Sequence, residues 1–215
     1  MDASVTKLKA STEKGEGMSN HNDRDDDKTF DVNYLFSKRG YLATPFMIYV
    51  RSYNVISDQE FMEIFGLKNY QKRAISDSKL FDSHVIFTND FEWTHIADDL
   101  GYTLWHSPRT SEVIAELGKS YDIFRNSIGD IDDSFEFEYY RNGKLARKFD
   151  YEHNVFKGTR SITAEVGSKI IAEPNTFEEL HTAAEKMFPE ITKALGIVRV
   201  TDPTQLRYYA KEKME

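Results

Sequence analysis

The sequence contains no cysteine among its 215 residues. This absence excludes a disulfide framework, catalysis by a thiol, and every zinc site that needs thiolate ligands, whereas metal sites built from histidine and carboxylate stay open. No segment approaches the ~18 consecutive apolar residues that a membrane-spanning helix needs. The amino terminus also lacks the basic and then apolar pattern of a secretory signal. We therefore expect a cytoplasmic protein without a membrane partner.

Basic residues are outnumbered, with 28 lysines and arginines against 36 acids and a formal net charge of -8. This balance disfavours a nucleic-acid backbone or an anionic membrane as the partner, because proteins that bind either surface usually display a basic patch. Gly15 and Gly17 lie in a polar segment and do not follow a strand, as a glycine-rich phosphate loop requires. We expect no cofactor.

The first 29 residues differ in composition from the remainder of the chain. Val5 and Leu8 are their only branched aliphatic residues, and charged and small polar residues dominate. Such a segment buries too little apolar area to offset the entropy of ordering it. We predict a disordered tail over residues 1–29 and, because no linker or repeat follows, a single α+β domain over residues 30–215.

Apolar patterns predict a series of short strands over residues 46–51, 85–88, 91–97, 102–105 and 121–126, and then a hairpin over residues 134–151. Three helices are predicted to begin at Ser57 with Glu60, at Ser107-Pro108, and at Thr176 with Glu179. Strands joined by turns, with helices inserted at irregular intervals, are typical of the α+β class. We predict an antiparallel, meander-type sheet that is covered on one face by helices.

The third predicted helix has a proline within its apolar pattern. Pro189 either kinks or splits this helix, or it begins a second one whose pattern ends before Gly196. The segment that begins at Thr201 predicts a further short helix.

The hairpin over residues 134–151 has two possible registers. A two-residue loop of Asn142 and Gly143 would place Phe137 opposite Lys148 and separate the aromatic residues of the two strands. A three-residue loop over residues 141–143, with Gly143 as a left-handed bulge, instead gathers the aromatic residues on one face. We predict this bulged register, because burying several aromatic side chains outweighs a preference between turn types.

The predicted core face of this hairpin holds Phe135, Phe137, Tyr139, Leu145, Phe149 and Tyr151. On the other face, Glu136 is predicted to lie opposite Lys148.

Candidate catalytic residues are few. His95 precedes Asp98 closely in the sequence, and a histidine with a carboxylate is suited to acid–base or metal chemistry. Packing beside Trp93 explains His95 more simply, and Asp98 belongs to a turn segment. A small hydrolase-type enzyme that uses the His95 and Asp98 neighbourhood is therefore the alternative hypothesis. His106, beside Trp105, is interpreted in the same way.

Five acids within nine residues form the largest local charge feature of the chain: Asp130, Asp132, Asp133, Glu136 and Glu138. Their composition resembles a calcium loop, but the glycine and the distal glutamate of an EF-hand are missing, so we predict no metal site. The cluster fits a solvated loop and strand face. It also fits a field that steers a basic protein partner and supplies ion pairs at the rim of an interface. These five acids are our candidate partner-binding residues.

A nucleic-acid-mimicking inhibitor, which needs carboxylates spaced like phosphates, is a further hypothesis.

The order of several segments adds a resemblance. FMIYVR, DQEFMEIFGL, FEWTHIADDLGYTLW, EFEYYRNGKLARKF and VGSKIIAEP follow one another in a way that resembles small bacterial domains and is similar to immunity proteins of polymorphic toxin systems. The similarity covers Ala43 to Gly196. It implies a cytoplasmic α+β inhibitor that neutralises a toxin by binding it and has no catalytic residues of its own.

Overall fold

The computed structural model describes residues 35–36, 40, 42–53, 55–74, 83–98, 103–105, 107–129, 132, 134–171, 173–174 and 184–211. The predicted tail over residues 1–29 lies outside these ranges, as do His106, Asp130, Asp133 and the capping box predicted at Thr176 and Glu179.

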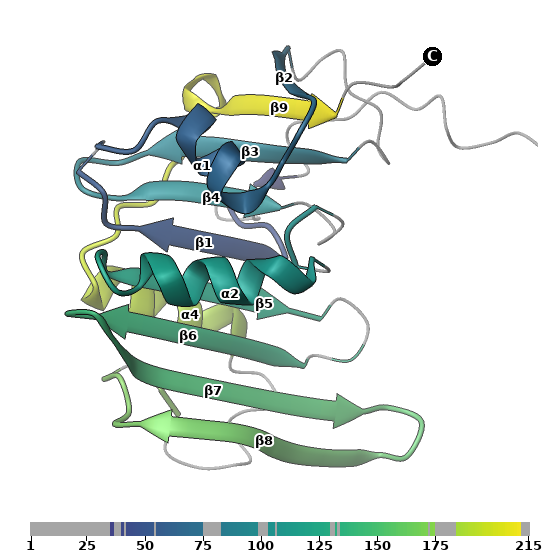
Figure 1. The fold of residues 1–215 in the computed structure, drawn as a ribbon. Helices are drawn as coiled ribbons and strands as arrows, with labels where there is room; N and C mark the ends of the chain where they lie inside the picture. Colours follow the sequence, from purple (N-terminus) through teal and green to yellow (C-terminus); the bar gives the residue numbers. More distant parts are fainter. Residues whose placement is uncertain are drawn as a thin grey trace, which may run out of the picture.

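Nine antiparallel strands of the described chain form one sheet, in the order β2-β9-β3-β4-β1-β5-β6-β7-β8 (Figure 1). Their bounds are Phe46–Val50 for β1, Tyr70–Arg73 for β2, His84–Asn89 for β3, Thr94–Asp98 for β4, Ile123–Ile128 for β5, Phe135–Arg141 for β6, Lys144–Asn154 for β7, Thr159–Gly167 for β8 and Arg207–Lys211 for β9. The predicted antiparallel sheet is confirmed. The meander holds for β5 to β8, whereas β1 lies between β4 and β5.

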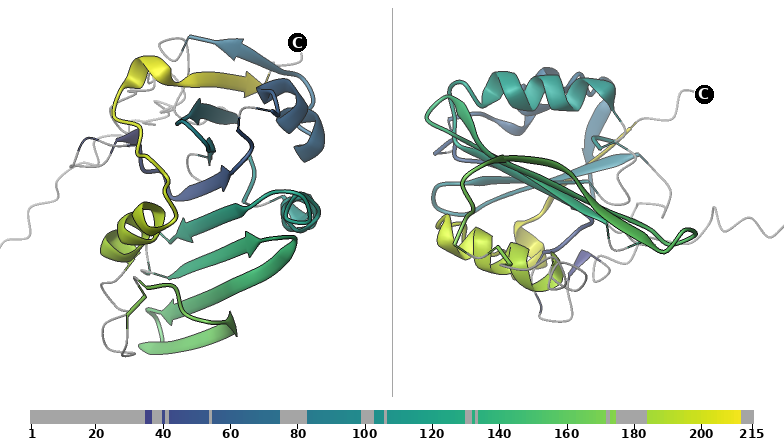
Figure 2. Two further views of the ribbon diagram at one scale, coloured as in Figure 1. Left: turned by 90° about the vertical axis from the view of Figure 1, so that its left-hand side faces the viewer. Right: turned by 90° about the horizontal axis from the view of Figure 1, so that it is seen from below.

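The central strands are buried on both faces of the sheet. Every residue of β1 is buried, and because successive side chains of a strand point to opposite faces, β1 contributes to two separate cores. Helices α1 (Asp58–Phe65) and α2 (Pro108–Leu117) pack on one face, and α4 (Ala184–Ala194) packs on the other (Figure 2). The prediction of helices on one face only is wrong, because a strand as uniformly apolar as β1 needs cover on both sides.

Local signals set the helix ends. The Ser57 and Glu60 capping box is confirmed, and α1 ends at Gly66, whose φ of 71° is the left-handed conformation that glycine adopts without strain. Helix α2 begins at Pro108, as predicted. Helix α4 continues through Pro189, so this proline neither splits the helix nor begins a second one. No helix within the described ranges is long and apolar enough to cross a membrane.

Two segments differ from their predicted conformation. A 3₁₀ turn over Pro203–Gln205 and the strand β9 replace the helix predicted from Thr201. Strand β9 lies between β2 and β3 and pairs antiparallel with both. Residues 103–105, predicted as a strand, form a turn, because their backbone N–H groups donate to the carboxylate of Asp98.

The turn of the β6–β7 hairpin differs from the prediction. Asn142 and Gly143 both have positive φ, of 51° and 74°, and Arg141 pairs with Lys144, which defines a two-residue turn. The positive φ predicted for Gly143 is confirmed, but the three-residue loop is wrong. The extra residue is instead Ala146, further along β7, where the register shifts.

The aromatic face of this hairpin is confirmed. Phe137 pairs with Phe149 and Phe135 with Tyr151, and all four side chains belong to the core on the α4 face. Beyond the bulge at Ala146 the register is two residues away from the predicted one, and a shift of two residues keeps these aromatic side chains on their predicted face.

Two details of the predicted hairpin are wrong for the same reason. Leu145 precedes the bulge and pairs with Tyr140, which packs on the α1 and α2 face. Glu136 lies opposite Asp150, and it is Glu138 that lies opposite Lys148.

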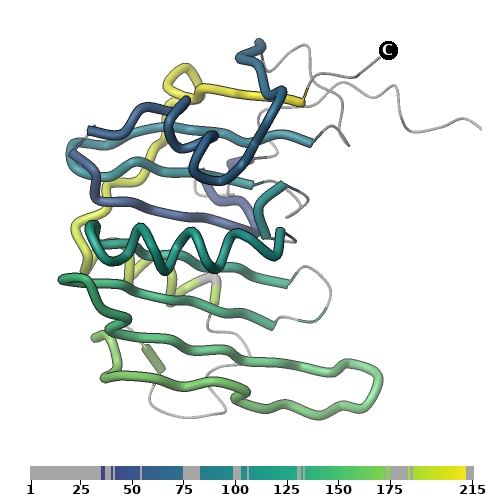
Figure 3. The backbone as a smooth tube through the Cα atoms, viewed as in Figure 1, coloured from purple at the N-terminus to yellow at the C-terminus, as the bar shows by residue number. Residues whose placement is uncertain are grey.

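Strand β8 accommodates the bulge through Gly167. A Cβ at Gly167 would lie 1.9 Å from the carbonyl oxygen of Ala146, and the φ of this glycine is 80°. The neighbouring Arg147 is buried, donates to the Gly167 carbonyl at 3.1 Å, and pairs with Glu173 through an Nε–Oε1 distance of 2.9 Å. These contacts hold β8 along β7, and the two strands extend as a hairpin beyond β6 (Figure 3).

Replacing Phe137 with alanine tests this core. Phe137 is fully buried, and its ring centroid lies 5.9 Å from that of Phe149 and 6.0 Å from that of Phe188. We expect the free energy of unfolding, measured with denaturant, to fall by about 3–5 kcal/mol. The same change at the exposed Phe91 serves as the control and should cost less than about 0.5 kcal/mol. A loss below about 1 kcal/mol at Phe137 would contradict this packing.

Candidate functional site

His95 and Asp98 lie on opposite faces of the sheet, so the predicted pairing of these two residues does not occur. They are three positions apart in β4, and side-chain direction alternates along a strand. His95 packs edge-on against Tyr49, at 5.0 Å between ring centroids, on the α4 face. The Asp98 carboxylate is buried and accepts the backbone N–H groups of the turn at residues 103–105.

The partner of His95 is Asp90, in the turn between β3 and β4. His95 Nε2 lies 3.0 Å from Asp90 Oδ2, and both side chains are buried. The same carboxylate accepts the backbone N–H groups of Glu92 and Trp93 at 2.8 and 2.7 Å, and that of Val198 at 2.7 Å. Burial alone raises the pKa of Asp90, but these hydrogen bonds outweigh it and hold the pKa below its ordinary value. Asp90 thus joins three segments of the chain.

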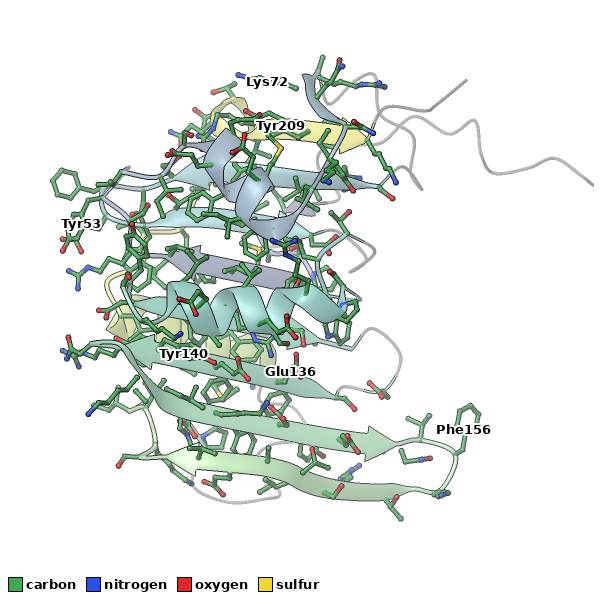
Figure 4. All side chains as sticks on the ribbon, viewed as in Figure 1. Tyr53, Lys72, Glu136, Tyr140, Phe156 and Tyr209 are labelled. Atoms are coloured by element: carbon green, nitrogen blue, oxygen red, sulfur yellow. The ribbon has the colours of Figure 1, made fainter. Side chains whose placement is uncertain are left out.

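Another carboxylate, the partly buried Asp58, anchors α1 to β9. Arg207 donates to it through Nε at 2.7 Å and Nη2 at 2.8 Å, and the Tyr209 hydroxyl donates at 3.0 Å. Burial, followed by the hydrogen bond to Asp58 and the charge of that carboxylate, raises the pKa of Tyr209 to about 12. The Asp58 carboxylate is therefore occupied by donors from β9, of which Tyr209 is labelled in Figure 4.

The predicted acidic cluster is divided by the structure. Asp130 and Asp133 lie outside the described residues. Asp132 holds a turn, because its Oδ1 accepts the backbone N–H of Ser134 at 3.0 Å. Glu136 and Glu138 lie on β6, on the face opposite the aromatic residues, as predicted.

Glu138 is buried between two basic residues on the neighbouring strands. Arg125 Nε and Lys148 Nζ each donate to it at 3.0 Å. The sequence-based prediction paired Lys148 with Glu136 and missed both contacts, because they depend on strand register. Burial raises the pKa of Glu138, but the charges and hydrogen bonds of Arg125 and Lys148 outweigh it, and the net direction is downward. Glu138 therefore contributes little free negative charge to the surface.

The charge of Glu136 is less neutralised by basic neighbours than the charge of Glu138. It lies opposite Asp150, another acid, and its contact with Arg125 is longer, at 3.8 Å. Burial raises the pKa of Glu136, and the charges of Asp150 and Glu138 raise it further against the opposing effect of Arg125. Like charges opposite each other on two strands are destabilising. Asp150 is itself paired with Lys148 at 3.3 Å, so of the two glutamates of β6, Glu136 is the one whose charge is less compensated.

Four exposed apolar side chains gather at the other end of the strands, around the β3–β4 turn. They are Tyr53, Val55, Phe91 and Val198, with exposed fractions of 57%, 71%, 86% and 61%. Backbone hydrogen bonds join their segments: Tyr53 N–H donates to the Glu92 carbonyl at 3.1 Å, and Val198 N–H donates to Asp90. We call these four residues the apolar patch, and Tyr53 marks it in Figure 4.

Arg51 lies beside the apolar patch. Its guanidinium group stacks 5.5 Å from the Tyr53 ring centroid and 5.9 Å from that of Trp93, and its Nε donates to Glu92 Oε2 at 2.9 Å. Aromatic residues and arginine are enriched among the side chains that dominate binding energy in protein interfaces. Several exposed apolar side chains from neighbouring segments beside them are typical of a protein contact surface.

Sequence reasoning missed this patch. The apolar pattern over residues 91–97 predicts a strand that begins at Phe91, whereas β4 begins at Thr94. The place of Phe91 directly after Asn89-Asp90, which are turn-forming residues, is a signal that it lies in a turn. Val198 comes from a segment more than a hundred residues away, and no local pattern connects it to the β3–β4 turn.

A metal centre finds no support in the described residues. No group of three or more histidines, cysteines and acids there is arranged to hold a metal ion. No protein-family model, curated protein or solved structure matches this chain. The geometry of the described residues therefore carries the functional argument, and it points to the apolar patch.

The two glutamates of β6 should respond to mutation in opposite directions. Glu138→Gln leaves Arg125 without its closest partner and should lower the free energy of unfolding at pH 7 by about 3 kcal/mol. This value is near the lower end for a broken buried ion pair, because Glu136 stays near Arg125. Glu136→Gln removes the repulsion with Asp150 and should stabilise the fold at pH 7 by up to about 1 kcal/mol.

The pH dependence gives a further check on these two variants. The folded-state pKa of Glu138 is below its ordinary value of 4.5, so its stabilisation is present above pH 4.5 and is lost as the pH falls through the folded-state pKa. The folded-state pKa of Glu136 is above 4.5, so stability is lost as the pH rises from 4.5 through that pKa. Denaturant unfolding of the wild type and of each variant is measured from pH 3 to 7. The difference between the wild type and a variant gives the pH dependence of stability that the replaced glutamate contributes. Equal destabilisation by the two variants would contradict this arrangement.

Proposed function

We propose that this chain acts by binding another protein through the apolar patch, and that it is an inhibitor of the immunity type, as the resemblance noted above implies. The observation that carries the proposal is the gathering of Tyr53, Val55, Phe91 and Val198 around one fixed turn. We place this activity in the cytoplasm, as the sequence predicts.

The rigidity of the turn supports binding. The Asp90 carboxylate holds the backbone of residues 92 and 93 and also the backbone of Val198. A surface that is already ordered loses little conformational entropy when a partner docks, so more of the contact energy appears as affinity. The buried Trp93 and the stacked Arg51 support the patch from beneath.

Charge supports a basic partner. The net charge of -8 creates a field that raises the association rate of a positively charged protein. The predicted acidic cluster acts in this proposal through that long-range field, to which Glu136, with its longer contact to Arg125, contributes more than Glu138. Glu92, beside the patch, provides a carboxylate that is about one third exposed.

The two other hypotheses have less support. An enzyme that uses His95 with Asp98 would need the two side chains on one face, and they lie on opposite faces. A nucleic-acid mimic needs an uninterrupted row of carboxylates, whereas Arg125 and Lys148 alternate with the acids across β5, β6 and β7.

A photo-crosslinking phenylalanine analogue tests the patch in the cells that make this protein. Placed at position 91, it should form a crosslink to one protein. The same analogue at position 156 serves as the matched control and should give no crosslink to that protein, because Phe156 is at least as exposed as Phe91 but lies at the far end of the β7–β8 hairpin (Figure 4). The crosslinked protein is then purified and its affinity measured.

Phe91→Ser should raise the Kd for that purified protein by about tenfold or more, since the loss of an aromatic anchor costs roughly 1–2 kcal/mol or above. Phe156→Ser should leave the Kd unchanged, and the wild-type chain should inhibit the activity of the bound protein. Equal affinity of Phe91→Ser and the wild type would overturn the patch as the contact surface. Binding without inhibition would overturn the inhibitor role.

A further inference from the structure

The two edges of the sheet are built differently. Strand β2 has four residues and exposes Lys72 and Arg73, and short, basic strands are a common protection against edge pairing. Strand β8 has nine residues, contains no proline, and exposes Ile162 and Val166 at 40% and 45%. Among the residues that the structure describes, no strand pairs with its outer edge. A long edge of this kind is a template for another strand.

The two charged side chains of β8 lie on the same face. Arg160 pairs with His153 and Glu165 with Phe149, and these β7 residues are four positions apart, on one face. In a regular strand Arg160 and Glu165, five positions apart, would lie on opposite faces. The bulge at Thr163, where the β7–β8 register shifts, brings them to one face.

This arrangement makes β8 complementary to itself. If two copies of β8 run antiparallel about an axis between Ile162 and Thr163, Arg160 of each copy lies opposite Glu165 of the other. Ser161 then lies opposite Ala164. Thr159 lies opposite Val166. The two side chains of each pair lie on the same face of the joined sheet, because a two-fold axis perpendicular to the sheet does not exchange its two faces. The two bulges meet at the axis, so the ladder is interrupted only there.

We propose that β8 pairs antiparallel with β8 of a second copy of this chain and joins the two sheets edge to edge. Opposite charges directly across two antiparallel strands are stabilising, and the symmetry supplies this pair twice. The same register directs the tip of the β7–β8 hairpin toward residues 169–171 of the second copy. Phe156 and Ile171, the two most exposed large apolar side chains of the described chain at 97% and 92%, would then approach each other.

The dimer is independent of the proposed inhibitor function. The apolar patch lies around the β3–β4 turn, whereas β8 is the opposite edge strand of the sheet (Figure 1). A second copy fits this edge better than a strand of another protein, because both signs of charge on β8 find their complement in β8 itself.

Cysteine crosslinking tests the register in a chain that has no cysteine of its own. Ser161→Cys and Ala164→Cys variants of the full chain, mixed and oxidised, should form a disulfide-linked dimer in high yield, because paired residues on antiparallel strands lie within disulfide range. Each variant alone should crosslink poorly, since its own cysteines are several residues apart in this register. Equal crosslinking in the mixture and in the separate variants would overturn the register.

Sedimentation equilibrium from 1 to 100 μM tests the association itself. The wild type should dimerise in this range, and Arg160→Glu and Glu165→Arg should each weaken the dimer by about tenfold. Mixing these two variants should restore wild-type affinity, because each opposite-charge pair forms again. Lys72→Glu, on the other edge strand, serves as the control and should have no effect.

A monomeric wild type at 100 μM would overturn the proposal, as would a dimer that Lys72→Glu weakens and Arg160→Glu does not. Glu165 also accepts a hydrogen bond from Arg147 at 3.0 Å, so unfolding curves of Glu165→Arg accompany the measurement. If that variant does not fold, the Arg160→Glu variant and the cysteine pair decide the question without it.

Discussion

The Asp90 carboxylate is the interaction on which the proposed binding surface depends. Four groups from three segments donate to it: the backbone N–H groups of residues 92 and 93, the His95 ring, and the backbone N–H of Val198. A carboxylate with this many donors is stable as an anion, which is why its pKa is lowered although the group is buried. Without it, the β3–β4 turn and the segment after α4 would lose the hydrogen bond from Val198 that joins them, and the apolar patch would lose its geometry.

The alternation of side-chain direction along each strand explains the other main features of the sheet. In the central strands this alternation builds two cores, each covered by its own helices. In the β6–β7 hairpin the bulge at Ala146 lets a two-residue turn coexist with a continuous aromatic face. The same register places Glu138 between Arg125 and Lys148, so one arrangement both fills the core and neutralises one acid of the predicted cluster. In β8 a second bulge brings opposite charges to one face.

The sequence could predict the features that are encoded locally. The capping box at Ser57, the start of α2 at Pro108 and the aromatic face of the hairpin each depend on residues close together in the chain. The type of turn was not predictable in the same way, because Asn142 and Gly143 fit two registers and the bulge that selects between them lies at an ordinary alanine. Strand β9 was missed because both of its neighbours are distant in sequence.

The candidate site was less predictable than the fold. His95 and the five acids were conspicuous in the sequence, but their partners were set by tertiary contacts: Asp90 for His95, and Arg125 and Lys148 for Glu138. The apolar patch combines residues from three separate segments, and none of them stands out alone. An exposed surface that is assembled across the fold leaves no periodic pattern in the sequence, whereas a buried strand or helix does.

Hydrogen exchange of individual backbone amides in Asp90→Asn measures the role of this carboxylate most directly and needs no partner protein. Asparagine has nearly the same shape but turns part of the acceptor into a donor. We predict that the amides of Trp93 and Val198, far apart in sequence, both exchange at least about tenfold faster, while the β6–β7 hairpin is unchanged. Unaltered exchange at Val198 would show that Asp90 does not hold the patch together and would contradict the account.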